Sequence, residues 1–187
     1  MLELNFTPFP NLQSARVVLR EMTNADIEDL FVLRSNKDLM QYIDRPIAQN
    51  PLDAEKLIAV ITENIANQGG ITWGISLQNS PRLIGTIGFW RIEKEHYRTE
   101  IGYLLHPDFQ GQGIMHEAML LAIGYAFDVM KVHSIEANVN PENNASIRLL
   151  ERYRFIKEGH FKDNYFFEGK FKDSAIYSLL TSSHKTD

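Results

Sequence analysis

Two glycines separated by one residue stand between an apolar strand-like run and a long apolar helix-like run, in the segment Gln110-Gly111-Gln112-Gly113. This order predicts a turn at a helix N-terminus, where backbone N–H groups lack partners within the helix and the positive end of the helix dipole lies. Such a turn is suited to phosphate, and a pyrophosphate-bearing ligand is the first interpretation. The alternative is a tight strand-to-helix connection, because this glycine spacing alone has little specificity.

The elements before the turn are expected to be a strand, two helices and an antiparallel meander. Alternating and β-branched residues predict strands at 15–22, 71–77, 82–93 and 99–105. Apolar residues at helical spacing follow the capping residue Thr23 and, further on, Pro51, which predicts two helices between the first two strands. The last three strands stand at hairpin spacing and lead directly into the glycine turn.

The elements after the turn are expected to include one parallel crossover. Residues 114–130 predict a helix that is apolar on most sides, which is typical of a helix packed deep against a sheet. A strand at 134–140 follows, and this order of strand, helix and strand forms a right-handed parallel unit in nearly all known cases. A short helix at 143–152, a strand at 155–161, a loop at 164–170 and a strand at 174–180 complete the chain. The expected class is α+β.

The composition predicts one domain and excludes several kinds of site. The chain has 187 residues, 44% hydrophobic and 23% charged, so we expect a single domain over residues 1–187 with a disordered tail from about 181 to 187. The absence of cysteine removes disulfides, thiolate metal sites and cysteine nucleophiles. Histidines and carboxylates show no recurring ligand spacing, so no metal site is predicted.

Charge and hydropathy narrow the expected partners. The net charge is −5 and the lysines and arginines form no dense cluster, so nucleic acid is not expected as a ligand. The sequence contains neither an apolar run of the roughly 18 residues that a membrane helix needs nor a start that resembles a signal peptide. We therefore expect a cytoplasmic protein without a membrane partner. The pattern does not distinguish a monomer from a homodimer.

Three motifs occur in order along the chain: a strand ending at Leu104-Leu105, the turn from Gln110 to Met115, and NPENNASIRLLERYRF one strand later. Together they resemble the GNAT superfamily of N-acetyltransferases, and RVVLREMTNADIEDLF and GTIGFWRI are similar to its RimJ/RimL-like branch. The resemblance spans nearly all of the chain, and ordered motifs are more specific than one glycine loop. It implies a mixed, mostly antiparallel twisted sheet whose two parallel strands splay apart, with acetyl-coenzyme A as co-substrate.

The resemblance also implies which residues bind acetyl-coenzyme A. The pantetheine arm would lie along the strand end at Leu104 and Leu105, where the N–H of Leu105 would face the thioester oxygen as a single oxyanion donor. Asn143 would hold the same arm. The pyrophosphate would lie on the turn formed by Gln110, Gly111, Gln112, Gly113, Ile114 and Met115.

Two residues depart from the family pattern. The phosphate turn of the family reads Gln/Arg-x-x-Gly-x-Gly/Ala, which puts Met115 where relatives have a small residue. Backbone donors do not depend on the side chain, so this departure bears on cofactor affinity more than on cofactor identity. Arg154 stands where relatives often have glycine, and it carries backbone strain if the turn there requires positive φ.

Acetyl transfer to an amine, which the resemblance implies, needs a group that takes the amine proton. Glu100 shares a strand face with Gly102, which has no side chain to block a substrate, and Glu136 lies on the polar face of residues 134–140. A carboxylate takes a proton through one water more easily from an α-amine than from a lysine. Each glutamate could instead be a solvated charge or an ion-pair partner. Glu100 is slightly preferred because its strand would deliver the thioester.

The departing thiolate needs a proton donor. In RimL-like members the serine at the position of Ser146 is proposed to have this role, so the resemblance makes Ser146 the candidate and Tyr153 the alternative acid. Asn143 and Ser146 are also common helix-capping residues, and a purely structural role stays open.

The resemblance implies direct attack of a primary amine on acetyl-coenzyme A in a ternary complex. The RimJ/RimL-like branch suggests a protein N-terminal α-amine, such as that of a ribosomal protein, as the acceptor. A small amine, such as a polyamine or an aminoglycoside, is the alternative for an enzyme, and a non-catalytic acyl-coenzyme A-binding module is the alternative of another class. Acceptor-binding loops are expected at 36–52 and 162–172, and the sequence of such loops does not identify the ligand.

Overall fold

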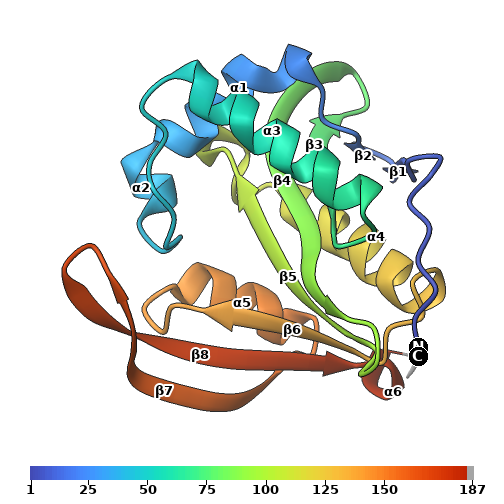
Figure 1. Ribbon diagram of the computed structural model, residues 1–187, viewed down its shortest axis with the longest axis vertical. Coiled ribbons are helices and arrows are strands. Elements are labelled where there is room, and N and C mark those ends of the chain that lie inside the picture. The colour runs from blue at the N-terminus through green and yellow to red at the C-terminus, as the bar shows by residue number, and fades with distance from the viewer. Residues whose placement is uncertain (185–187) are drawn as a thin grey trace.

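The computed structural model describes residues 1–184, and its centre is one eight-stranded sheet with the order β1-β2-β3-β4-β5-β6-β8-β7 (Figure 1). The strands are β1 (Leu12–Gln13), β2 (Val17–Arg20), β3 (Ile71–Leu77), β4 (Ser80–Glu93), β5 (Arg98–Leu105), β6 (Ser134–Val139), β7 (Ile156–Phe167) and β8 (Lys170–Leu180). Every neighbouring pair is antiparallel except β5 and β6, which are parallel. The expected α+β class, the meander and the parallel crossover are confirmed.

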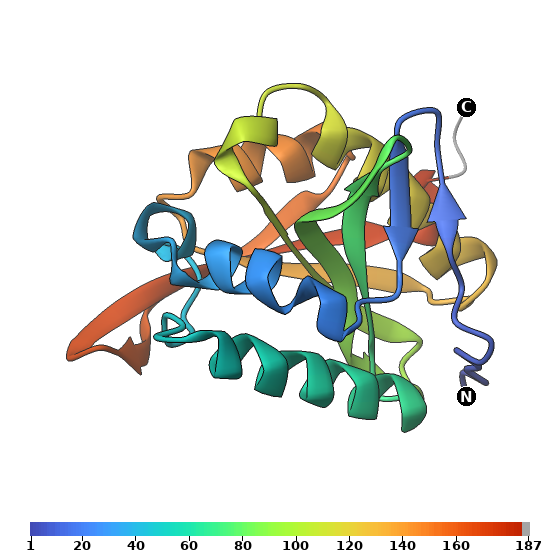
Figure 2. The same cartoon turned by 90° about the horizontal axis from the view of Figure 1, so that it is seen from above.

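Helices cover both faces of this sheet (Figure 2). On one face, α1 (Ile27–Ser35) and α3 (Pro51–Ala66) share an apolar cluster with Leu104. On the other face, α4 (Ile114–Asp128) and α5 (Asn144–Arg152) contribute to the main core cluster, which contains Leu105. We call these the α1/α3 face and the α4/α5 face. The shorter helical segments are η1 (Asn24–Asp26), α2 (Lys37–Met40), η2 (Pro107–Phe109) and α6 (Thr181–His184).

Local capping chemistry explains where several helices begin. Thr23 and Asp26 form a capping box at the start of η1, and Pro51 occupies the first turn of α3, where its missing N–H leaves no bond unmade. The helix α4 is buried over much of its surface, as its apolar sequence predicts. Within residues 1–184, no helix has the length and apolar character needed to cross a bilayer.

The parallel strands β5 and β6 pair over only three residues, from Arg98 opposite Ser134 to Glu100 opposite Glu136. Beyond Glu100 the two strands separate, and Figure 1 shows them diverging from their shared start. Both strands keep their outer neighbours, since β4 pairs with β5 as far as Leu105 and β8 with β6 as far as Val139. The predicted splay is therefore confirmed, and residues 101–105 of β5 border a gap that we call the β5–β6 gap.

The C-terminal hairpin is longer than the sequence suggested. The loop expected at 164–170 is wrong, because Tyr165, Phe166 and Phe167 pair with the first residues of β8 and leave only Glu168 and Gly169 between the strands. These two residues have φ of 47° and 79°, as a two-residue hairpin turn requires, and aromatic residues favour strands. The expected disordered tail begins instead with the helix α6, and residues 185–187 lie outside the described part of the chain.

Candidate active site

The glycine turn forms the start of α4. Gly111 and Gly113 have φ of 70° and 78°, in the left-handed region that favours glycine, and Gly113 is the N-cap of the helix. Among the described residues no side chain caps this helix start, so its first N–H groups can bind an anion. A Cβ on Gly111 would find no atom within 4 Å. The turn thus has the open backbone and the orientation that a phosphate group needs.

The remaining residues of the turn hold it in place. Gln112 Nε2 donates to the carbonyl oxygen of Asp108 at 2.6 Å, and Ile114 is buried in the core. The side chain of Met115 packs against the main core cluster, which accounts for a large residue at this position. Arg154, the other departure from the family pattern, has φ of 64°, so the condition under which backbone strain is expected there is met.

Arg16 lies beside the turn and was not predicted from the sequence. Its Nη1 donates to the carbonyl oxygen of Gln112 at 3.1 Å, and its guanidinium pairs with Glu117 of α4 at 2.5 Å. The hydroxyl of Ser14 also donates to Glu117, and these hydrogen bonds and the charge of Arg16 lower the pKa of the Glu117 carboxyl. Arg16 is about 100 residues away from Gln112 and Glu117 in sequence, so no local pattern reveals these contacts.

The backbone at the end of β5 is oriented so that the N–H and C=O groups of Leu105 point into the β5–β6 gap. The N–H of His106 donates to the carbonyl oxygen of Ile84 in β4 at 2.8 Å. Because peptide groups along a strand point alternately to either side, those of Leu105 point away from β4. The carbonyl oxygen of Leu105 accepts a hydrogen bond from Gln110 Nε2 at 2.9 Å, which joins the strand end to the turn. This orientation is the one that an oxyanion donor at Leu105 N–H requires.

A pair of hydroxyls spans the α4/α5 face of the gap. Tyr103 Oη of β5 and Ser146 Oγ of α5 lie 2.7 Å apart, and either can be the donor. Burial raises the pKa of Tyr103 to about 12, although its hydrogen bond to Ser146 acts in the opposite direction, so Tyr103 remains protonated near neutral pH. Helix α5 is capped by the side chain of Asn143, whose Oδ1 accepts from the backbone N of Ser146 at 3.1 Å. The hydroxyl of Ser146 is therefore not consumed by capping.

Tyr103 is a second residue that the sequence reasoning missed. Its position on the strand face opposite Glu100 was visible, but its partner Ser146 is 43 residues away on a helix whose placement the sequence does not give.

Tyr153, the alternative acid, has a different partner. Its hydroxyl donates to the backbone carbonyl oxygen of His116 at 2.6 Å and also contacts His116 Nδ1, in the first turn of α4. Burial raises the pKa of the Tyr153 hydroxyl. Ser146 in the first turn of α5 and Tyr153 at its C-cap thus engage different groups: Ser146 hydrogen-bonds to Tyr103 of β5, and Tyr153 to His116 of α4.

The two glutamates lie side by side on the α1/α3 face, since Glu100 and Glu136 are partners in the parallel pair. Glu100 is buried, and its Oε2 accepts from Arg91 Nη1 at 2.8 Å. Glu136 Oε2 lies 3.6 Å from Arg98 Nη1, and Arg98 also bonds Glu93. All five side chains line a cavity of about 150 Å³. Both glutamates are therefore ion-pair partners, and both also face a space that can admit a small ligand.

The expectation of open space above Gly102 is wrong. A Cβ on Gly102 would lie 1.8 Å from the Trp90 ring, so the indole covers this glycine. Trp90 is opposite Glu100 in the β4–β5 register, which is irregular between Trp90 and Glu93, and Arg91 within this stretch has φ of 48°. The irregularity therefore places Trp90 over Gly102 and Arg91 on Glu100, so the path to the carboxylates is narrower than the sequence implied.

The two expected acceptor loops are tied to each other. Asp44, between α2 and α3, accepts from Tyr165 Oη at 2.6 Å and from Lys172 Nζ at 2.7 Å, both in the β7–β8 hairpin. Desolvation and the neighbouring Asp44 raise the pKa of Tyr165. The loops expected at 36–52 and 162–172 thus meet, and the second of them is the end of a hairpin.

The described residues contain no group of three or more histidines, aspartates or glutamates that could hold a metal ion. The site instead consists of an anion-binding turn, a strand edge, a hydroxyl pair on one face of the sheet and a carboxylate pair on the other.

Comparisons with known proteins point to one family. The family described as acetyltransferase (GNAT) domain matches residues 16–156. The N-acetyltransferase YoaA of Bacillus subtilis (strain 168), described as uncharacterized, is 32% identical over 92% of this chain and 97% of its own. The ribosomal protein uS5-alanine N-acetyltransferase of Escherichia coli (strain K12) is 30% identical over 66% of this chain and 64% of its own.

A solved structure shares the fold at lower identity. The spermidine N-acetyltransferase from Vibrio cholerae, in complex with CoA and spermine, superposes with a TM-score of 0.81 at 22% identity and covers 92% of this chain and all of the other.

Proposed function

This chain belongs to the GNAT acetyltransferase family, and on that premise we propose that it acetylates the N-terminal α-amine of a protein or peptide. It is an acetyl-coenzyme A-dependent N-acetyltransferase, which sets aside the non-catalytic module. Support for a peptide acceptor comes from the similarity to a ribosomal protein-alanine N-acetyltransferase. A free α-amine also loses its proton more readily than a polyamine or lysine amine, with a reference pKa of about 8 against about 10.

The residues at the β5–β6 gap fit acetyl-coenzyme A. The left-handed glycine turn with open space at Gly111 suits the pyrophosphate, and the edge of β5 at Leu104 and Leu105 suits the pantetheine arm. Asn143, the N-cap of α5, would hold the same arm. When bound, the co-substrate supplies an activated acetyl group. The sequence-derived binding residues are therefore retained as proposals for this role.

The observation that carries the proposal is that a proton acceptor and a proton donor lie on opposite faces of the sheet at the gap: carboxylates on the α1/α3 face and hydroxyls on the α4/α5 face. Glu100, with Glu136 beside it, accepts the proton that the amine gives up as its nitrogen bonds to the acetyl carbon. The N–H of Leu105 stabilises negative charge on the acetyl oxygen. Ser146, oriented by Tyr103, donates its proton to the sulfur as the carbon–sulfur bond breaks, and water returns a proton to its hydroxyl oxygen.

Coenzyme A release tests both the acceptor and the base. We expect turnover with peptides that carry a free N-terminus and little with spermidine or an aminoglycoside. In the Glu100→Gln variant kcat falls by about 10²-fold or more, the range for loss of a general base, while the Kd for coenzyme A is unchanged. The same replacement at Glu136 distinguishes the two carboxylates, and the larger loss identifies the base.

Glu95→Gln is the matched control, because Glu95 is exposed in the turn between β4 and β5. Preferential turnover of spermidine would refute the peptide acceptor. Unchanged kcat in Glu100→Gln would remove Glu100 from the mechanism.

A further inference from the structure

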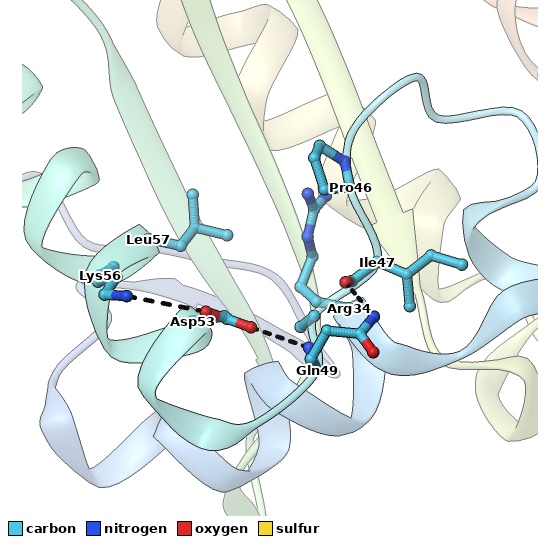
Figure 3. Close-up of a pocket in the computed structure, with 8 residues that line it drawn as sticks. Arg34, Pro46, Ile47, Gln49, Asp53, Lys56 and Leu57 are labelled. Atoms are coloured by element: carbon cyan, nitrogen blue, oxygen red, sulfur yellow. Dashed lines mark hydrogen bonds and ion pairs between the residues drawn. The ribbon is translucent and has the colours of Figure 1, made fainter. Parts of the chain in front are cut away.

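A second cavity, of about 320 Å³, lies on the α1/α3 face (Figure 3). It is formed by the end of α1, the segment that precedes α3 and the first turns of α3. The side chains that matter here are Arg34, Gln49, Asp53, Lys56 and Leu57. Figure 3 shows Arg34 rising from α1 beside Pro46, with Asp53, Lys56 and Leu57 on the opposite wall.

The guanidinium of Arg34 has no hydrogen-bond or ion-pair partner within residues 1–184. Arg34 is partly buried, and desolvation together with the nearby charge of Arg45 lowers its pKa. Two other partly buried cations are paired: Arg20 lies 2.6 Å from Asp26, and Lys172 lies 2.7 Å from Asp44. A charge that is removed from water without a counter-ion is unfavourable, so Arg34 has the environment of a group that binds an anion from solution.

The charge inventory of the cavity points the same way. Its one carboxylate, Asp53, already accepts from the backbone N of Gln49 at 2.9 Å and lies 3.9 Å from Lys56 Nζ. Arg34, Lys56 and the nearby Arg45 outnumber it, although the whole chain has a net charge of −5. An arginine fork is suited to the two oxygens of a carboxylate or phosphate.

The cavity is connected to the transfer site through shared packing. Leu57, in its wall, and Leu33, next to Arg34, belong to the same apolar cluster as Leu104 at the end of β5. This face also carries Glu100 and Glu136, whereas Ser146 and the glycine turn belong to the elements of the α4/α5 face. A group bound at Arg34 is therefore on the side of the sheet from which the amine reaches its base.

We propose that this cavity binds an anionic group of the amine acceptor, so that the enzyme favours peptides with an acidic side chain near the N-terminal amine and disfavours polyamines. This inference rests on the proposed function. The cavity could recognise the anionic group of any amine that bears a carboxylate or phosphate. The experiment below therefore distinguishes a peptide from a free amino acid as the acceptor that carries this group.

Paired acceptors test the preference. We would measure kcat/KM for peptides that differ only by Glu or Gln at positions 2, 3 or 4, and for free glutamate and glutamine. Wild type is expected to favour the acidic peptide about tenfold at one of these positions and to turn over neither free amino acid appreciably. Arg34→Gln removes this preference and leaves kcat/KM for the neutral peptide within about twofold. Arg34→Lys, which keeps the charge but loses the fork, retains part of the preference.

Lys157→Gln, an exposed position on β7, is the charge-matched control and keeps the full preference. Equal kcat/KM for the acidic and neutral peptides in wild type, or an equal loss of preference in Lys157→Gln, would overturn the inference. A preference for free glutamate over every peptide would support the anion site but assign it to a small acceptor.

A binding measurement separates this inference from the proposed function. Inorganic phosphate is titrated by calorimetry into enzyme saturated with coenzyme A, so that the glycine turn is occupied. We expect binding that is at least tenfold weaker in Arg34→Gln. Phosphate binding that depends on Arg34 together with turnover of spermidine alone would refute the peptide acceptor and leave the anion site standing. Peptide turnover with identical phosphate binding in wild type and Arg34→Gln would refute the anion site alone.

Discussion

The contact between Tyr103 and Ser146 makes a quantitative prediction about the thiolate donor. A neutral hydrogen bond of this kind contributes about 0.5 to 1.5 kcal/mol net, and the distance of 2.7 Å between Tyr103 Oη and Ser146 Oγ is optimal. If Tyr103 donates to Ser146, the Ser146 proton is directed away from Tyr103 and toward the sulfur. Tyr103→Phe removes this orientation but keeps the donor, so we expect kcat to fall about 5- to 10-fold, equivalent to about 1 kcal/mol.

Ser146→Ala removes the donor itself. Loss of a general acid lowers kcat by about 10²- to 10⁴-fold, so we expect a decrease of at least about 10²-fold. Because Tyr103 acts through Ser146 in this scheme, the double variant should be no slower than Ser146→Ala alone. This non-additivity is the signature of one residue positioning the other.

The assay is coenzyme A release at saturating acetyl-coenzyme A and acceptor, with the Kd for coenzyme A measured separately by calorimetry. Tyr125→Phe is the matched control, because Tyr125 is buried in the core and the described residues offer its hydroxyl no hydrogen-bond partner. Losses that multiply in the double variant, or a Tyr103→Phe enzyme with wild-type kcat, would refute the positioning role. A change in Kd without a change in kcat would reduce the pair to a binding contact.

Two further predictions concern stability and cofactor affinity. The pKa of Tyr103 is raised to about 12 from a reference of about 10, so its protonated hydroxyl stabilises the fold below pH 10, and this stabilisation is lost as the pH rises to 12. In urea unfolding, the free energy of unfolding of wild type should fall by about 2 to 3 kcal/mol more than that of Tyr103→Phe over this range. Equal decreases would show that burial does not raise the pKa of Tyr103. Gly113→Ala should lower the free energy of unfolding by about 1 to 2 kcal/mol, because its φ is 78°, and should weaken coenzyme A binding about tenfold by calorimetry. Gly124→Ala within α4, where a Cβ meets no atom within 4 Å, is the control and should be neutral or stabilising. An unchanged Kd for coenzyme A in Gly113→Ala would argue against the turn as the phosphate site.

Features set by short-range signals could be predicted from the sequence. The capping residue Thr23, the glycine turn and the crossover from β5 to β6 depend on neighbours within a few residues or on a handedness that holds almost universally. The departure of Arg154 from a family motif marked the position where the backbone has a positive φ, although from the sequence that φ was only a condition for strain.

Features that depend on distant side chains could not be predicted in this way. Gly102 was interpreted as open space because a strand pattern gives the face of a residue but not what a neighbouring irregular strand places over it, here Trp90. The sequence places Ser146 at the start of a helix, but its hydrogen bond to Tyr103 depends on the distance between that helix and the edge of β5, which the sequence does not give. The unpaired state of Arg34 likewise depends on which carboxylates fail to reach it.

The short pairing of β5 with β6 has a consequence for how the molecule resists unfolding. An eight-stranded sheet is usually weakest at its outer strands, but here the strand pairing between the half that ends at β5 and the half that begins at β6 comprises only three residue pairs. A ligand that hydrogen-bonds along the free edge of β5 would act as a missing strand between the halves. Occupancy by coenzyme A should therefore slow amide hydrogen exchange at the centre of the sheet more than at its margins.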